Sequence, residues 1–238
     1  GLPADSGLWE QRFPTMMANA IAACANHGSK LVFFDNTYMY PRTSAPQTED
    51  TAFEPVGRKA GVRARIASML LTEMDAGTID AVICRAPEFY GPGKTQSVTN
   101  SAVFDRIKRG KQPLVPVDAH TRRTLIWTPD ASRAMARIGN TPDAYGQTWH
   151  LPVDPDRLTY HEMIGLAAEA TGRRIRYITV PGWAFRIGGL INPAVREVEE
   201  LLQRYRQDNV FDSSKFTARF PDFPVTSYPE GISQLVRD

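Results

Sequence analysis

A short, uninterrupted apolar run is the strongest feature of the hydrophobic pattern. Residues 30–40 read K-L-V-F-F-D-N-T-Y-M-Y, so that four apolar residues, Leu31 to Phe34, are followed at once by polar ones. A run this short, rich in branched and aromatic residues, predicts a strand that is buried on both faces, as in a parallel sheet. A second run over residues 79–84, I-D-A-V-I-C, has the same character and also ends in a polar, turn-rich segment.

Helical patterns flank these two strands. Apolar residues recur on one side of residues 14–27, so we expect a helix there, after a loop over residues 1–14 and before Gly28 as a left-handed cap. A second helix is expected from about Gly57 to Ala76. The connection over residues 41–57 is rich in Pro, Thr, Ser and acidic residues, and a loop of this length in a compact domain is usually functional or mobile. Two such βα units predict a doubly wound α/β sheet.

The rest of the chain is expected to form shorter elements. Thr128 is predicted to be an N-cap with Pro129 at the first helical position, and Thr159 with Glu162 predicts a capping box that opens a helix over residues 160–171. The pattern also predicts a helix over 98–110, extended pieces over 114–117, 122–127, 147–152 and 174–180, helices over about 182–190 and 193–206, and then a Phe/Pro-rich tail. The Trp and Phe residues of 183–223 are expected to form the core of a small domain.

Composition narrows the class of partner. The 238 residues carry a net charge of +2, which favours neither a nucleic acid nor a membrane surface as a partner. The chain has no apolar run that could span a bilayer and no secretory signal pattern, so a cytoplasmic protein is expected. Cys24 and Cys84 are far apart in apolar segments and are expected to be buried thiols. The four histidines show no metal-ligand spacing, and no metal is expected.

Polar side chains gather where the first strand ends. Asp35, Asn36, Thr37, Tyr38 and Tyr40 follow it directly, and ligands bind at the carboxyl ends of the strands in open α/β sheets. These residues are therefore expected to line a cleft. A simpler interpretation stays open, in which the aspartate and asparagine only form a turn and the tyrosines only pack.

Three separated motifs are similar to those of one known family. Residues 85–93 read R-A-P-E-F-Y-G-P-G, close to the family's R-P-x-x-x-Y-G-P-G, and residues 123–130 read R-T-L-I-W-T-P-D, close to R-D-x-I-x-V-x-D. The third is T-W-H-L-P followed by L-T-Y-H-E-M, near the strand and helix of a substrate domain. Together they resemble the NAD-dependent epimerase/dehydratase family, the extended branch of the short-chain dehydrogenases. The resemblance implies an α/β fold: a Rossmann-like parallel sheet in residues 1–112, with later segments around 122–150 returning to it, and a smaller C-terminal α/β substrate-binding domain mainly in 113–238.

The resemblance also implies an enzyme that exchanges hydride between NAD or NADP and a nucleotide sugar or a related hydroxyl or carbonyl substrate. The family uses a Ser or Thr, a Tyr as general acid/base, and a Lys four residues later whose charge lowers the pKa of that Tyr. Lys59 fits the lysine and Asn36 the Ser/Thr position, but Pro55 stands where the tyrosine would be, so Tyr38 is the candidate replacement. No glycine-rich phosphate-binding fingerprint occurs here, and an N-terminal part of the sheet is expected to precede Gly1.

The remaining roles follow from position in the motifs. The catalytic candidates are Asn36, Tyr38 and Lys59; the cofactor-binding candidates are Asp35, Lys59, Arg85, Ala86 and Pro87; the substrate-binding candidates are Thr37, Glu88, Tyr90 and Arg123. For Lys59 and Arg123 the alternative of an exposed surface residue stays open. Family members are often dimers, which implies a homodimer through the helix at 57–76. Pro55 motivates an alternative function, a catalytically impaired dinucleotide-binding or regulatory protein on the same fold.

Overall fold

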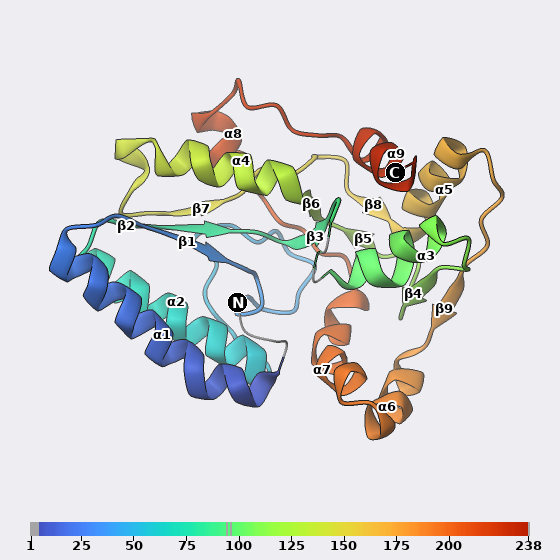
Figure 1. The fold of residues 1–238 in the computed structure, drawn as a ribbon, viewed down its shortest axis with the longest axis horizontal. Helices are drawn as coiled ribbons and strands as arrows, with labels where there is room; N and C mark the ends of the chain where they lie inside the picture. The colour runs from blue at the N-terminus through green and yellow to red at the C-terminus, as the bar shows by residue number, and fades with distance from the viewer. Residues whose placement is uncertain (1–4, 94, 96, 238) are drawn as a thin grey trace.

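A three-stranded parallel sheet lies at the centre of the computed structural model, which describes residues 5–93, 95 and 97–237 (Figure 1). Its order is β1 (Leu31–Asp35), β2 (Ala81–Arg85) and β7 (Thr148–His150), and the register sets Asp35 beside Arg85. Helices α1 (Ser6–His27) and α2 (Arg58–Asp75) cover one face, and α4 (Thr128–Gly139) covers the other. The predicted α/β fold with a Rossmann-like parallel sheet is confirmed.

Strand β2 is completely buried because both of its faces are apolar. Successive side chains of a strand point to opposite faces. Ala81 and Ile83 accordingly pack with Met17, Ile21, Ile66 and Leu70 of the two helices on one side, whereas Val82 and Cys84 pack with Ala131, Ala134 and Ile138 of α4 on the other. The predicted continuous apolar run is what a strand covered by helices on both faces requires.

Strand β1 differs from the prediction of burial on both faces. Phe34 remains 38% exposed, and its ring stacks on Phe89 at a centroid distance of 5.8 Å. The reason is position, because β1 is an edge strand of the described sheet and pairs only with β2 there.

Helix α1 begins eight residues before its predicted start, so the prediction of a loop up to residue 14 is wrong from Ser6 onward. Residues 1–4 lie outside the described part. The Asp5 side chain accepts a hydrogen bond from the Leu8 backbone N–H at 2.9 Å and caps the helix, and Pro14 is accommodated inside it. Gly28 ends the helix with φ 61°, which confirms the predicted left-handed cap.

Local capping signals gave mixed results elsewhere. Helix α5 (Tyr160–Thr171) begins at the predicted capping box of Thr159 and Glu162, both halves of which form. The predicted N-cap at Thr128 is wrong: Trp127 occupies the cap position, and the Thr128 hydroxyl donates to the carbonyl of Tyr90 at 3.0 Å instead. The predicted helix over 98–110 opens with a π-helical turn, η1 (Asn100–Phe104), before α3 (Asp105–Lys108).

The remaining elements form small paired strands and a second helical layer. β3 (Glu88–Tyr90) pairs in parallel with β6 (Leu125–Trp127), β4 (Leu114–Pro116) in parallel with β9 (Ile178–Val180), and β5 (Arg122–Arg123) antiparallel with β8 (Leu158–Thr159). The helices are η2 (Pro142–Ala144), α6 (Gly182–Ile191), α7 (Pro193–Leu202), η3 (Gln203–Tyr205), α8 (Ser214–Arg219) and α9 (Tyr228–Arg237). The tail is therefore more helical than its Phe/Pro content indicates. Among the described helices, none is both long and apolar enough to cross a membrane.

The late aromatic residues do not all join one small core, contrary to expectation. Phe216 and Phe220 of α8 pack with Trp149 in the cluster that covers the central sheet, and Trp183 is 61% exposed. A separate cluster, which includes Phe104, Trp127, Tyr160 and Leu235, joins α3, α5 and α9. Cys84 is buried as predicted, Cys24 is half-buried, and both thiols are free.

A buried network of hydrogen-bonded side chains joins the strand ends to the loop that follows β1. Asp35 accepts a hydrogen bond from Nε of Arg85 at 3.2 Å, and Arg85 Nη1 donates to the Tyr40 hydroxyl at 2.6 Å. That hydroxyl lies 2.7 Å from Nε2 of His150, whose Nδ1 lies 2.7 Å from the carbonyl oxygen of Asp212. Because a carbonyl only accepts, Nδ1 carries the proton and Nε2 accepts from Tyr40. Burial lowers the pKa of His150 to about 3, which keeps the ring neutral.

Replacing Tyr40 with Phe removes the hydroxyl that connects Arg85 to His150. Two buried polar groups then lose a partner, so the free energy of unfolding is expected to fall by about 1–3 kcal/mol. Urea unfolding followed by circular dichroism measures the change. The control is Tyr177→Phe, whose hydroxyl bonds His161 at an exposed position and whose loss is expected to change stability by less than about 0.5 kcal/mol. Equal effects of the two variants would contradict a stabilising role for this buried hydrogen-bond network.

Candidate functional site

A cavity of about 70 Å³ lies where β1 and β2 end. The loop after β1 contributes Asn36, Thr37 and Tyr38, and the segment after β2 contributes Pro87, Glu88 and Phe89. The remaining lining residues are Ser97, Val98, Arg123, Leu201, Arg204, Tyr205 and Asn209. Residues 197–205, here called the covering segment, close the cavity from the side of α7 and η3. The cavity is small and only partly enclosed, so as it stands it has room for a small part of a ligand.

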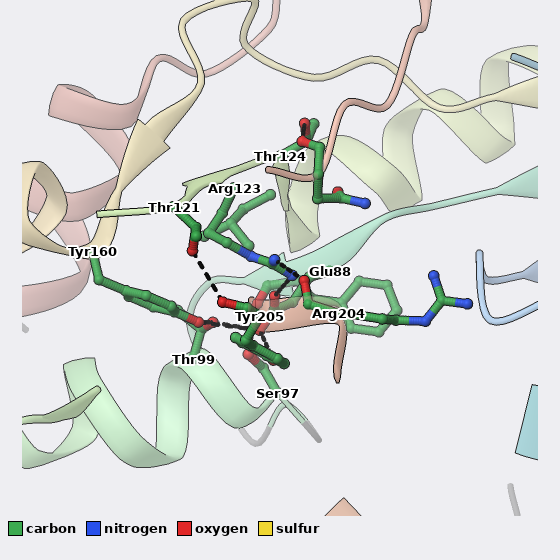
Figure 2. A network of polar contacts seen from close by, with 12 residues as sticks. Glu88, Ser97, Thr99, Thr121, Arg123, Thr124, Tyr160, Arg204 and Tyr205 are labelled. Atoms are coloured by element: carbon green, nitrogen blue, oxygen red, sulfur yellow. Dashed lines mark hydrogen bonds and ion pairs between the residues drawn. The ribbon is translucent and has the colours of Figure 1, made fainter. Parts of the chain in front are cut away.

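Glu88 is the centre of the polar network in this cavity, and Figure 2 shows its partners converging on it. Its Oε1 accepts from the hydroxyls of Thr99 at 2.5 Å and Tyr205 at 2.7 Å. The Tyr160 hydroxyl lies 2.6 Å from the Thr99 hydroxyl oxygen and donates a hydrogen bond to it. These hydrogen bonds fix the position of the Glu88 carboxylate in the cavity wall.

Arg123 is buried beside Glu88 rather than exposed to solvent. Its Nη2 lies 3.3 Å from Glu88 Oε2, its Nη1 donates to the carbonyl of Arg204 at 2.6 Å, and its guanidinium lies 4.4 Å from the ring centre of Tyr205. Burial works against the positive charge, but Glu88 together with the phenols outweighs it and raises the pKa of Arg123. The surface alternative for this arginine is therefore wrong, and its charged partner is the carboxylate of Glu88.

Tyr38 presents the phenol that lines the cavity. Asn36 accepts a hydrogen bond from the Tyr38 backbone N–H at 3.0 Å, so the expected turn and the expected cleft occur together. Burial raises the pKa of Tyr38; the positive charges of Arg63 and Arg204 oppose that effect, and the carboxylates of Glu88 and Glu200 add to it. The phenol is therefore protonated at neutral pH, with two guanidiniums near enough to stabilise a phenolate that forms there.

Lys59 is a buried residue of α2, which makes the solvated alternative wrong. Its side chain is 3% exposed; Nζ lies 3.0 Å from Oε2 of Glu197 and donates to the carbonyl of Glu197 at 2.7 Å. The Lys59 backbone N–H donates to Oε1 of Glu200 at 3.0 Å. Gly57 has φ 101°, and a Cβ there would come within 2.5 Å of the Glu200 side chain. The covering segment thus docks closely on the first turn of α2.

The other sequence-derived candidates lie behind or beside the cavity. Asp35, Arg85 and Ala86 are buried next to one another, and the Ala86 N–H donates to the Asp35 carbonyl at 3.0 Å. Tyr90 is 1% exposed in the core, stacked on Tyr228. The cavity therefore brings together Asn36, Thr37, Tyr38, Pro87, Glu88 and Arg123, and its lining omits Asp35, Lys59, Arg85, Ala86 and Tyr90.

Sequence reasoning missed the residues that reach the cavity from far along the chain. Arg204 donates from Nη2 to the carbonyls of Tyr38 and Tyr40 at 2.5 and 3.0 Å. Burial lowers the pKa of Arg204 to about 10, and repulsion from Arg42 adds to this, but the group stays charged at neutral pH. The pattern around 197–209 carries no motif that indicates these contacts. Among the described residues, no cluster of His, Cys, Asp and Glu is arranged to hold a metal ion.

The chain is similar to known proteins along most of its length. Residues 10–151 match the model of a family described as the NAD dependent epimerase/dehydratase family. The 2'-dehydrokanamycin reductase of Streptomyces kanamyceticus is 23% identical over 222 residues, which cover 92% of this chain and 61% of that protein. The chain thus spans about three fifths of the length of this curated relative.

Solved structures share the fold at low identity. The UDP-glucuronic acid 4-epimerase of Bacillus cereus in complex with NAD superposes with a TM-score of 0.73 at 13% identity, covering 93% of this chain and 66% of that one. RMD of Pseudomonas aeruginosa complexed with NADPH gives a TM-score of 0.70 at 15% identity, covering 93% of this chain and 70% of that one. At these identities the likeness establishes the fold.

The ion pair of Lys59 with Glu197 is expected to couple the covering segment to α2. In a double-mutant cycle of Lys59→Met and Glu197→Gln, measured by urea unfolding, a coupling energy of about 0.5–3 kcal/mol is expected because the lysine is buried. The exposed pair of Arg137 and Asp222 serves as the control and is expected to couple by less than about 1 kcal/mol. A buried-pair coupling near zero would show that the covering segment does not depend on this contact.

Proposed function

Because the chain belongs to the NAD-dependent epimerase/dehydratase family, we propose that it is an oxidoreductase that uses NAD or NADP to act on a hydroxyl or carbonyl carbon of a sugar. One relative is named a reductase of 2'-dehydrokanamycin, and one solved structure with this fold is a UDP-glucuronic acid 4-epimerase with NAD bound. The chain covers only part of those proteins, so their activities enter here as support for a proposal. The motifs predict a nucleotide sugar or a related hydroxyl or carbonyl compound as substrate, and the proposal keeps this broader class.

The residues present fit one end of a dinucleotide. An apolar groove of about 440 Å³, lined in part by Phe34, Phe89 and Met135, adjoins the cavity through Phe89 and would accept a flat ring. Pro87 lies on the cavity side of the same segment. No glycine-rich phosphate-binding loop occurs in the described part of the chain, so these residues would hold only the nicotinamide end. Lys59 is proposed to contact the cofactor. To do so, its ammonium group must break its contact with Glu197 and form a new one with the cofactor.

The observation that carries the proposal is a protonated phenol in the cavity at the strand ends. A bound reduced nicotinamide would supply hydride to a carbonyl carbon of the substrate. Tyr38 then donates its proton to the carbonyl oxygen and completes the alcohol, while Arg63 and Arg204 stabilise the phenolate until water returns the proton. Thr37 and Asn36, which line the same cavity, are placed to orient a substrate hydroxyl.

The domain division and the dimer are retained as proposals. The hydrophobic cluster that joins α3, α5 and α9 supports a separate substrate-binding unit within residues 113–238, whereas α8 packs on the sheet of the proposed cofactor unit. A homodimer through α2 rests on the family resemblance alone.

A dinucleotide-binding regulatory protein is the second candidate. It is favoured by Pro55, which cannot exchange a proton at the position of the family's tyrosine, and by the engagement of Lys59 with Glu197. In that case the protein binds NADH or NADPH in stoichiometric amount and reduces no carbonyl compound.

Replacing Tyr38 with Phe is expected to lower kcat for carbonyl reduction by roughly a hundredfold or more, because the proton donor is lost. The measurement is consumption of NADH or NADPH by the full-length protein over a panel of ketosugars. Since the pKa of Tyr38 is raised, the wild-type rate of reduction is expected to stay level from neutral into mildly alkaline pH. The reverse oxidation, which needs the phenolate, is expected to speed up as the pH rises.

Tyr145→Phe is the control, because that hydroxyl bonds the Gly139 carbonyl at the far end of the sheet. Unchanged kcat in the Tyr38 variant would remove Tyr38 from the mechanism. Stoichiometric cofactor binding without turnover of any ketosugar would favour the regulatory candidate instead.

A further inference from the structure

The guanidinium of Arg123 is already engaged by the protein itself. Nη1 is bound by the Arg204 carbonyl, Nη2 faces Glu88, and one ring face of Tyr205 covers the group. The side chain is 4% exposed, and its Nε is buried without a hydrogen-bond partner among the described residues. Arginine binds phosphate most strongly through two parallel N–H···O hydrogen bonds from one edge of the guanidinium. Arg123 presents no such free edge to the cavity.

The carboxylate of Glu88 is held in place as firmly as its partner. Thr99 and Tyr205 donate to Oε1, Arg123 pairs with Oε2, and the side chain keeps 16% of its surface exposed where it lines the cavity. Turning Glu88 away would leave several buried donors without an acceptor. The carboxylate of Glu88 is therefore a fixed part of the cavity wall.

We propose that Glu88 determines specificity by neutralising Arg123, so that the cavity selects a sugar substrate without a nucleoside diphosphate. This inference rests on the proposed oxidoreductase function. A diphosphate carries at least two negative charges, and if it entered this cavity it would meet the Glu88 carboxylate in the lining. Like-charge juxtaposition is an effective way to reject a ligand. Among the described residues of the lining, the other cation is Arg204, whose Nη2 donates to the carbonyls of Tyr38 and Tyr40.

The remaining polar lining suits neutral hydroxyl groups. The side chains of Thr37, Tyr38 and Asn209 line the cavity and have no hydrogen-bond partner among the described residues. Hydroxyls and amides both donate and accept, as sugar hydroxyls do. Glu88 adds an acceptor for a substrate O–H or N–H. The set matches a phosphate-free polyhydroxylated compound or an amino sugar.

Calorimetric titration of uridine diphosphate tests the proposal without requiring turnover. Wild-type protein is expected to show no binding up to millimolar concentration. Glu88→Gln removes the carboxylate that pairs with Arg123 Nη2, so at least a tenfold gain in affinity is expected. Glu88→Asp is the matched control: it keeps the charge and is expected to show no gain. Adding Arg123→Gln to the Glu88→Gln variant is expected to abolish the gain.

Micromolar binding of uridine diphosphate to the wild type would overturn the proposal, and so would a folded Glu88→Gln variant without improved affinity. If that variant does not fold, the wild-type titration decides by itself. A second measurement compares NADH or NADPH consumption with free 3-ketoglucose and with a thymidine-diphosphate-linked ketosugar, and a larger kcat/KM for the free sugar is expected. Turnover of neither would contradict the oxidoreductase function, while the titrations would still decide whether the cavity rejects a diphosphate.

Discussion

The buried ion pair of Asp35 with Arg85 is the interaction on which the site depends. The two residues end adjacent strands in register, and each strand leads directly into a segment that lines the cavity. Removing one partner of such a pair leaves an uncompensated buried charge, a loss of about 3–5 kcal/mol. Through Tyr40 and His150 the pair also ties β7 and the chain near Asp212 to the same point. Its role is therefore to hold the cavity-lining segments in place from behind.

Local patterns predicted the parts of the fold that local physics determines. The strand at Leu31, the left-handed end at Gly28 and the capping box at Thr159 each depend on residues within a few positions of one another. The start of α1 was missed because Pro14 was interpreted as a boundary, whereas Asp5 provides the cap. The exposure of Phe34 could not be predicted, because it depends on which strands pair in the described sheet and not on the run itself.

The candidate site was predictable only on the side formed by strand ends. Asn36, Thr37 and Tyr38 follow a strand, and the rule that ligands bind at such ends located them. The opposite wall comes from residues that are distant in sequence: Arg123 and Arg204 are 81 positions apart. For Lys59 the sequence allowed two interpretations, a contact with a ligand or a solvated side chain. Its burial against Glu197 is a tertiary contact that no residue spacing indicates.

The covering segment also has a kinetic consequence. Three cations from separate parts of the chain donate to its carbonyls: Lys59 to Glu197, Arg42 to Glu200 and Arg123 to Arg204. A ligand larger than the closed cavity must break several of these charge-assisted bonds before it can settle. Association is then gated, so its observed rate approaches a plateau as ligand concentration increases, at the rate with which the segment opens.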